Sequence, residues 1–132
     1  MSEHSASMQG LAKQVRAALE STDLSAFSDL LDPNVRWGPP GDQSPPCQSR
    51  EQVLTWYQRG RDRGTTAEVS EVTVLGDRII VGLVVAGSPA ARERGGQALR
   101  WQVLTVRNGR VVEIVGFDQR NKAAEWAAVP AS

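Results

Sequence analysis

Apolar residues recur at helical spacing through the first quarter of the chain. Between residues 8 and 20 they return every three or four positions, as one face of an amphipathic helix requires. Those positions are Met8, Leu11, Val15, Ala18 and Leu19. A second stripe predicts another helix, which Asp23 would cap and Asp32-Pro33-Asn34 would end, because proline cannot continue the hydrogen-bond ladder. The apolar positions of this stripe are Leu24, Phe27, Leu30 and Leu31.

The middle of the chain predicts a short strand, a loop and a third helix. Val35-Arg36-Trp37 is the strand, and GPPGDQSPPC at 38–47 is a loop dominated by Gly and Pro. Ser49 with Gln52 three residues later forms a capping box, which opens a helix ending near residue 60 or 64. One face of this helix carries Val53, Trp56 and Tyr57.

From residue 66 the period changes to two, which is typical of β-strands. Residues 68–85 form a hairpin that turns at Gly76–Asp77, and a flexible charged loop follows at 87–96. Pairing across the turn gathers one apolar face: Val72, Val74, Ile79, Val81, Leu83 and Val85. A second hairpin at 99–118 turns at Asn108–Gly109, and residues 120–127 predict a short terminal helix.

Pairing about Asn108–Gly109 sets Trp101 directly opposite Gly116. One face of this hairpin then carries Leu99, Trp101, Val103, Thr105, Val112, Ile114, Gly116 and Asp118. Two features predict an interior pocket: a glycine that lies beside a tryptophan, and a carboxylate at the end of an apolar face. Core packing is the commoner explanation of the first feature. The opposite face carries Arg100, Gln102, Leu104, Val106, Val111, Glu113, Val115 and Phe117. So much apolar surface predicts a symmetric partner over this face, or else the chain's own loops.

Helices precede strands, which indicates an α+β fold: a curved antiparallel sheet wrapped around the helices. We expect a disordered tail at 1–7, one domain at 8–127 and a second tail at 128–132.

The amino-acid composition argues against several classes of function. Fifteen basic residues balance fifteen acidic ones with no basic stripe, which argues against nucleic acid, and no apolar run is long enough for a membrane span. Cytoplasm is the default compartment. The single histidine, His4, and the single cysteine, Cys47, make a zinc site or a nucleophile–histidine pair improbable. We expect Cys47 to be an inert, partly covered thiol.

The layout resembles the nuclear transport factor 2-like (cystatin-like) fold, and within it the SnoaL-like branch. The residues that carry the resemblance are VRAALESTDLSAFSDLLDPNVRWGP (15–39), SREQVLTWY (49–57), VLGDRIIVGL (74–83) and RWQVLTVRNGRVVEIVGFDQRNKAAE (100–125). The resemblance spans about residues 8–127. It implies a cone-shaped fold with an apolar pocket, usually in a homodimer. The same fold occurs in enzymes, ligand-binding proteins and scaffold proteins, so the resemblance implies no single function.

The catalytic positions of three related enzyme groups test this resemblance. Ketosteroid isomerases place a tyrosine and two aspartates where this chain has Val15, Gly38 or Trp37, and Trp101. Limonene epoxide hydrolases place an Arg-x-Asp pair and a further aspartate where this chain has Leu83, Val85 and Gly116. Neither chemistry is therefore expected. SnoaL-type polyketide cyclases use an acid–base aspartate late in the fold, for which Asp118 is the only counterpart.

Asp118 has two interpretations. In an apolar pocket it would be a general acid or base, whereas before the terminal helix it would be an N-cap, with Arg120 as an ion-pair partner.

The resulting hypothesis is a pocket for a small apolar molecule of polyketide, steroid or terpenoid type. Chemistry, if present, would be a cyclisation or isomerisation by proton transfer through Asp118, which needs no cofactor or metal. The residues expected to contact the substrate are Trp37, Trp56, Tyr57, Trp101, Val103, Ile114 and Gly116. The 38–48 loop would close the mouth. The alternatives are a non-catalytic ligand binder and a homodimerisation module filled by its own tryptophans.

Overall fold

A computed structural model of the chain describes residues 3–20, 24–38, 47–87, 92–93 and 95–128. Its helices are α1 (Glu3–Glu20), α2 (Ser25–Leu30), α3 (Arg50–Asp62) and α5 (Arg120–Ala128). Its strands are β1 (Leu31–Gly38), β2 (Thr66–Leu75), β3 (Arg78–Ala86), β4 (Gln97–Arg107) and β5 (Arg110–Phe117). The α+β class and the order of the elements are as the sequence predicts.

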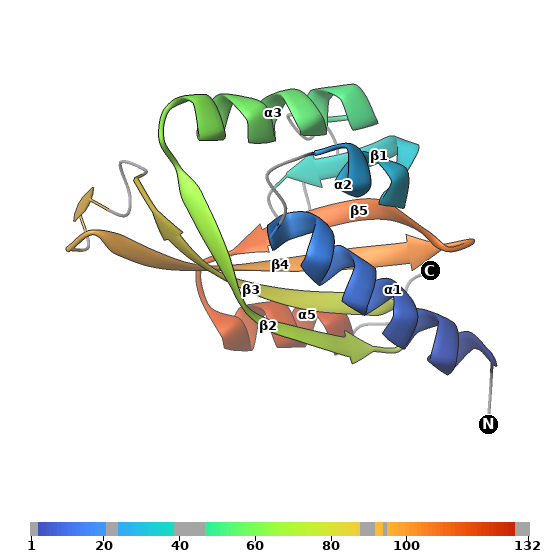
Figure 1. Ribbon diagram of the computed structural model, residues 1–132. Coiled ribbons are helices and arrows are strands. Elements are labelled where there is room, and N and C mark those ends of the chain that lie inside the picture. Colours follow the sequence, from blue (N-terminus) through green and yellow to red (C-terminus); the bar gives the residue numbers. More distant parts are fainter. Residues whose placement is uncertain (1–2, 21–23, 39–46, 88–91, 94, 129–132) are drawn as a thin grey trace.

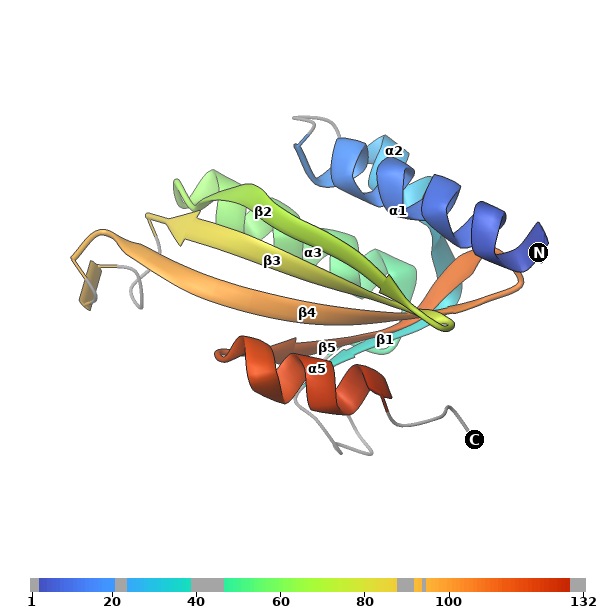
Figure 2. The same ribbon diagram turned by 90° about the horizontal axis from the view of Figure 1, so that it is seen from below.

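The five strands form one curled sheet in the order β1-β5-β4-β3-β2, in which β1 runs parallel to β5 and the other neighbours are antiparallel. Helices α1, α2 and α3 lie on one face of the sheet, which we call the inner face, and α5 lies on the other, the outer face (Figures 1 and 2). The inner core joins Val15, Phe27 and Val53 of the helices to Val81 and Leu104 of the sheet. A smaller outer core packs Ala123 and Ala127 of α5 against the other face.

Local sequence signals place most of the element boundaries. However, α2 ends at Leu30 and β1 begins at Leu31, so Leu31, expected in the second helix, and Asp32-Pro33-Asn34, expected to end it, lie in the strand. The backbone N–H of Gln52 donates to Ser49 Oγ at 3.2 Å, so the predicted cap of α3 is present. The β2–β3 turn pairs Leu75 with Arg78, and its predicted apolar face lies in the inner core. Helix α1, however, begins at Glu3, so residues expected in the N-terminal tail are helical. Asp23 and most of the 38–48 loop lie outside the described residues.

The last hairpin corrects the predicted pairing. Its turn is as expected: Asn108 and Gly109 both have positive φ (54° and 77°), as a two-residue type I′ turn needs. Val106 then pairs with Val111, but Thr105 pairs with Glu113, so β5 contains one extra residue, Val112. Such a β-bulge shifts the register by one position and exchanges the faces of every residue beyond it.

Trp101 consequently lies opposite Phe117, and Gln102 lies opposite Gly116. Each predicted face of the hairpin is split between the two sides of the sheet. The outer face carries Trp101, Val103, Val115 and Phe117, and the inner face carries Arg100, Gln102, Leu104, Ile114 and Gly116.

This register also changes the basis for expecting a dimer. Leu104, Val106 and Val111 belong to the chain's own inner core, and Phe117 packs near α5 on the outer face. The apolar residues that predicted a partner are therefore covered within the chain, by its helices rather than by its loops.

The glycine that makes room for Trp101 is Gly82, not Gly116. Gly82 of β3 pairs directly with Trp101 of β4. A Cβ on Gly82 would overlap the indole ring and would lie 2.8 Å from Ser70 Oγ. Among the described residues, a Cβ on Gly116 would meet only Arg100 Nη2, at 3.8 Å.

Helix α5 is held at both ends. Near its start, Arg120 donates to the two carboxylate oxygens of Glu71 at 2.9 and 2.7 Å, and its guanidinium lies 5.9 Å from the Trp101 ring centre. At its end, buried Arg78 donates to the carbonyl of Trp126 at 2.6 Å. Arg120, expected beside Asp118, therefore serves to fix α5 against β2.

The two glycines make a matched test of the register. We expect Gly82→Ala to destabilise the protein by about 1–3 kcal/mol, as overpacking does, because the new methyl group has no free space. Gly116→Ala should leave stability nearly unchanged. Urea unfolding of both variants measures this difference, and equal effects at the two positions would contradict the described register.

The contact between Glu71 and Arg120 predicts a pH effect. Hydrogen bonds from Arg120 and then from Thr73 lower the pKa of Glu71 from 4.5 to about 2. A carboxyl whose pKa is lower in the folded protein than in the unfolded chain stabilises the fold above pH 4.5. This stabilisation is lost as the pH falls towards 2. Wild type should exceed Glu71→Gln in thermal stability at pH 7, modestly because the pair is half exposed. In thermal melts, this difference in stability between wild type and Glu71→Gln should shrink as pH falls from 4.5 to 2. A difference that does not change with pH would refute the contact between Glu71 and Arg120.

Candidate functional site

A cavity of about 620 Å³ lies between the inner face of the sheet and the C-terminal halves of α1 and α3. We call it the wide-end pocket. Figure 1 shows the elements that surround it, with α3 above the sheet. The helices contribute Leu19, Glu20, Trp56, Tyr57, Gly60 and Arg61. The segment into β2 contributes Gly64, Thr65, Thr66 and Ala67, and the other strands contribute Trp37, Leu83, Val85, Ala98, Arg100, Trp101, Gln102 and Gly116.

One wall of this pocket is aromatic. Trp37 and Tyr57 stack with ring centres 5.0 Å apart and planes 24° apart, and Phe27 meets Tyr57 edge-on at 5.2 Å. Trp56 meets Trp37 edge-on at 6.2 Å and is 56% exposed. The backbone of Trp37 is fixed in turn by two hydrogen bonds with Cys47, at 2.9 and 3.2 Å. Stacked rings on anchored backbone suit a flat apolar ligand.

A polar pair lies among these apolar residues. The Tyr57 hydroxyl donates to Gln102 Oε1 at 3.3 Å, and Gln102 is buried. Burial raises the pKa of Tyr57 to about 12, against the smaller lowering effects of Gln102 and of the Arg61 charge. Tyr57 is therefore a neutral phenol at physiological pH, able to donate or accept a hydrogen bond.

Gly116 and Arg100 meet on the sheet side of the pocket. Arg100 pairs with Leu83 across β3 and β4, and both belong to the inner face. Its Nη2 atom lies 3.8 Å from the point where a Cβ of Gly116 would be. Because Gly116 has no side chain, an open space remains beside it. The Arg100 guanidinium borders this space, and the Trp101 indole does not occupy it.

The structure brings together five of the residues expected to contact substrate: Trp37, Trp56, Tyr57, Trp101 and Gly116. Trp101 only borders the pocket, because its ring packs in the outer core over Gly82. Val103 lies in the outer core and Ile114 in the inner core, both fully buried, so neither lines the pocket. The one-residue bulge accounts for the change of side between Val103 and Ile114.

Asp118 is exposed, lies just beyond β5 and does not line the pocket. It does not occupy the N-cap position either, since the carbonyl of Gln119 accepts the first helical bond, from Ala123 at 3.3 Å. Sequence reasoning missed Arg100 and Gln102, which it assigned to the opposite face from Gly116. Cys47 is buried, and burial raises the pKa of its thiol, which disfavours the reactive thiolate.

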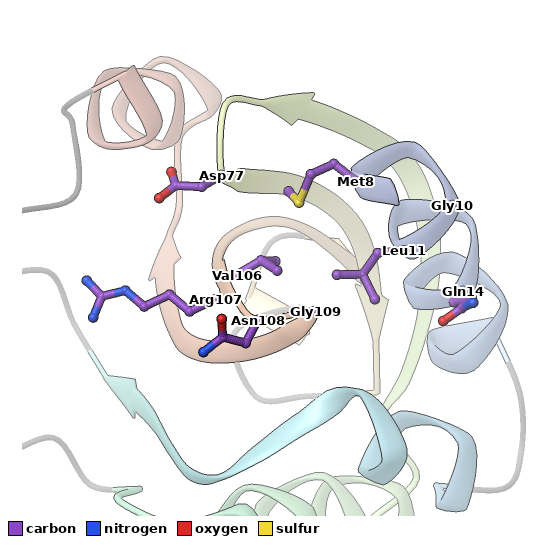
Figure 3. A pocket seen from close by; sticks show the side chains of 9 residues that line it. All are labelled: Met8, Gly10, Leu11, Gln14, Asp77, Val106, Arg107, Asn108 and Gly109. Atoms are coloured by element: carbon purple, nitrogen blue, oxygen red, sulfur yellow. The ribbon is translucent and has the colours of Figure 1, made fainter. Parts of the chain in front are cut away.

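A second cavity, of about 810 Å³, lies between the first half of α1 and the two hairpin turns. Figure 3 shows Met8 and Leu11 pointing from α1 towards Val106, with Asp77 and Arg107 on the far side. Its polar lining residues, which include Gln14 and Asn108, are exposed or half exposed, and none of its described lining residues is aromatic. It is a weaker candidate for a ligand site than the wide-end pocket.

The described part of the chain holds neither a metal-binding cluster nor a membrane-spanning helix. No group of three or more His, Cys, Asp or Glu residues there is arranged to hold a metal ion. None of the helices there combines the length and the apolar composition needed to cross a bilayer.

Solved structures share this fold. A candidate polyketide cyclase from Sinorhizobium meliloti matches with a TM-score of 0.63 and 23% identity, covering 84% of this chain and 98% of that one. A candidate ketosteroid isomerase from Kribbella flavida matches with a TM-score of 0.68 and 18% identity, covering 85% and 77%. A protein with a cystatin-like fold from Xanthomonas campestris matches with a TM-score of 0.64 and 21% identity, covering 91% and 97%. At these identities the likeness establishes the fold alone.

Comparison at the level of sequence gives the family. No curated protein is similar enough to this chain to count as a relative. The family model described as the SnoaL-like domain, in contrast, matches residues 12–114, which is most of the chain and includes most of the residues that line the wide-end pocket. The chain therefore belongs to the SnoaL-like domain family.

Proposed function

We propose that this chain binds a small, flat, apolar molecule in the wide-end pocket. The observation that supports this most is the pocket itself: about 620 Å³, walled by Trp37 and Tyr57, with one buried polar pair. Ligand pockets commonly range from about 300 to 1,000 Å³ and combine apolar walls with a few placed polar groups.

The names of similar structures favour a ring-containing ligand. Two of them are a candidate polyketide cyclase and a candidate ketosteroid isomerase. Stacked aromatic walls suit such a ligand by area and by ring geometry. The Tyr57 hydroxyl and the Gln102 amide would orient a carbonyl or hydroxyl group on it.

Binding is better supported than acid–base catalysis. The ionisable residues among the described lining are Glu20, Tyr57, Arg61 and Arg100. A general base must come within hydrogen-bond reach of the proton that it removes, and Asp118 is not part of the lining. A cyclase or isomerase mechanism through Asp118 would need a ligand that extends beyond this pocket, so we place it second.

A pair of variants tests the proposal. Isothermal titration calorimetry with 2-naphthamide, a neutral fused-ring probe, should detect binding with a negative heat-capacity change. Gly116→Val adds methyl groups in the open space beside Arg100, and it should weaken binding by more than about tenfold, or about 1.4 kcal/mol, without unfolding the protein.

Asp118→Asn is the matched control for Gly116→Val. We expect it to bind the probe as wild type does. No binding of the probe to wild type, or unchanged binding by Gly116→Val, would contradict the proposed site; a loss of binding in Asp118→Asn would mean that the ligand extends beyond the described lining to Asp118.

The role of Tyr57 as a neutral donor predicts its titration. It is the only tyrosine of the chain, so absorbance at 295 nm reports its ionisation alone once the tryptophan background is subtracted. The midpoint should lie near pH 12 rather than 10. Because the pKa is raised in the folded state, stability should fall as pH rises from 10 to 12. A midpoint near 10 in folded protein would show that the hydroxyl is not buried.

A further inference from the structure

The wide-end pocket has an electrostatic asymmetry that an apolar ligand alone does not explain. Among the residues that the structure describes, two guanidinium groups, Arg61 and Arg100, border it, against one carboxylate, Glu20. Glu20 is also engaged by Arg16, at 3.3 Å. The described lining is therefore net positive, while the whole chain carries no net charge at pH 7.

Arg100 is the more informative of the two cations. The register of β4 places it on the inner face, opposite Leu83 and two residues from Gln102. Within the described ranges, no carboxylate lies within ion-pair distance of it. Its guanidinium borders the space above Gly116, where almost any other residue would place a side chain. The pocket thus presents an unpaired cation beside a vacancy on its sheet side.

We propose that the natural ligand is an aromatic or polyene acid whose carboxylate pairs with Arg100 while its ring lies against Trp37 and Tyr57. This inference rests on the proposed function and specifies the class of ligand for the same site.

The chemistry of the guanidinium favours this class. Its planar donors match a carboxylate with two parallel hydrogen bonds, which are stronger than bonds between neutral groups. Arg100 is exposed in the free protein, so it loses little hydration until a ligand covers it. A ring filling the pocket would exclude water from the ion pair and so strengthen it.

Arg61 reinforces this preference from the opposite wall. It lies close enough to Tyr57 for its charge to oppose the rise in the pKa of that hydroxyl. A second positive field across the pocket adds long-range attraction for an anion without contacting it. A neutral ligand would gain from neither cation.

Two probes of the same shape test the proposal. 2-Naphthoate and 2-naphthamide share the ring system and differ in charge. At low ionic strength, calorimetry should show that wild type prefers the carboxylate by about tenfold or more. The preference should shrink as salt is raised, because screening weakens an ion pair at a partly open site.

Arg100→Gln should abolish this preference by weakening binding of 2-naphthoate while leaving 2-naphthamide binding unchanged. Arg110→Gln is the matched control, since it removes the same charge from an exposed position at the β4–β5 turn, outside the wide-end pocket. It should keep the preference of wild type. Thermal melts of both variants verify that they are folded.

Each other outcome overturns the proposal, and the outcomes separate it from the proposed function. Equal affinity of wild type for the two probes would refute an anionic ligand and leave an apolar pocket standing. A preference that survives Arg100→Gln would assign the anion to another cation. Failure of both probes to bind would refute the pocket itself.

Discussion

A single extra residue in β5 determines which side chains reach the pocket. Val112 has no partner in the ladder between Val106–Val111 and Thr105–Glu113. Because side chains alternate along a strand, this bulge turns Ile114 and Gly116 inward and Val115 and Phe117 outward. Without it, Gly116 would pair with Trp101 on the outer face, and the pocket would lose the open space beside Arg100.

The outer face depends on the same register. The Trp101 ring packs over Gly82, and the ring centres of Phe117 and Trp126 lie 6.2 Å apart. Helix α5 covers β4 and β5 at this place. Arg78 and Glu71 then hold the two ends of α5 from β3 and β2. The sheet is therefore covered on both sides by its own helices, and the open space is displaced to the wide end of the inner face.

Much of this fold can be predicted from local patterns, because helical stripes, the Ser49–Gln52 cap and both hairpin turns are encoded in adjacent residues. The family resemblance, which the SnoaL-like match confirms, extends this to the topology of the sheet. Side-chain placement beyond Asn108–Gly109 could not be predicted in the same way. The run from Val111 to Val115 is apolar at nearly every position, so no alternation marks the residue that bulges. Strict alternation therefore predicts Arg100 and Gln102 on the face away from Gly116, and it predicts Asp118 in a pocket that it does not line.

The most direct test of this account is the pairing of β4 with β5 in solution. Cross-strand backbone nuclear Overhauser effects in isotopically labelled protein would measure it. The described register predicts contacts between Trp101 and Phe117 and between Gln102 and Gly116. Contacts between Trp101 and Gly116 and between Gln102 and Val115 would mean an unbulged hairpin, and would contradict the pocket built on this register.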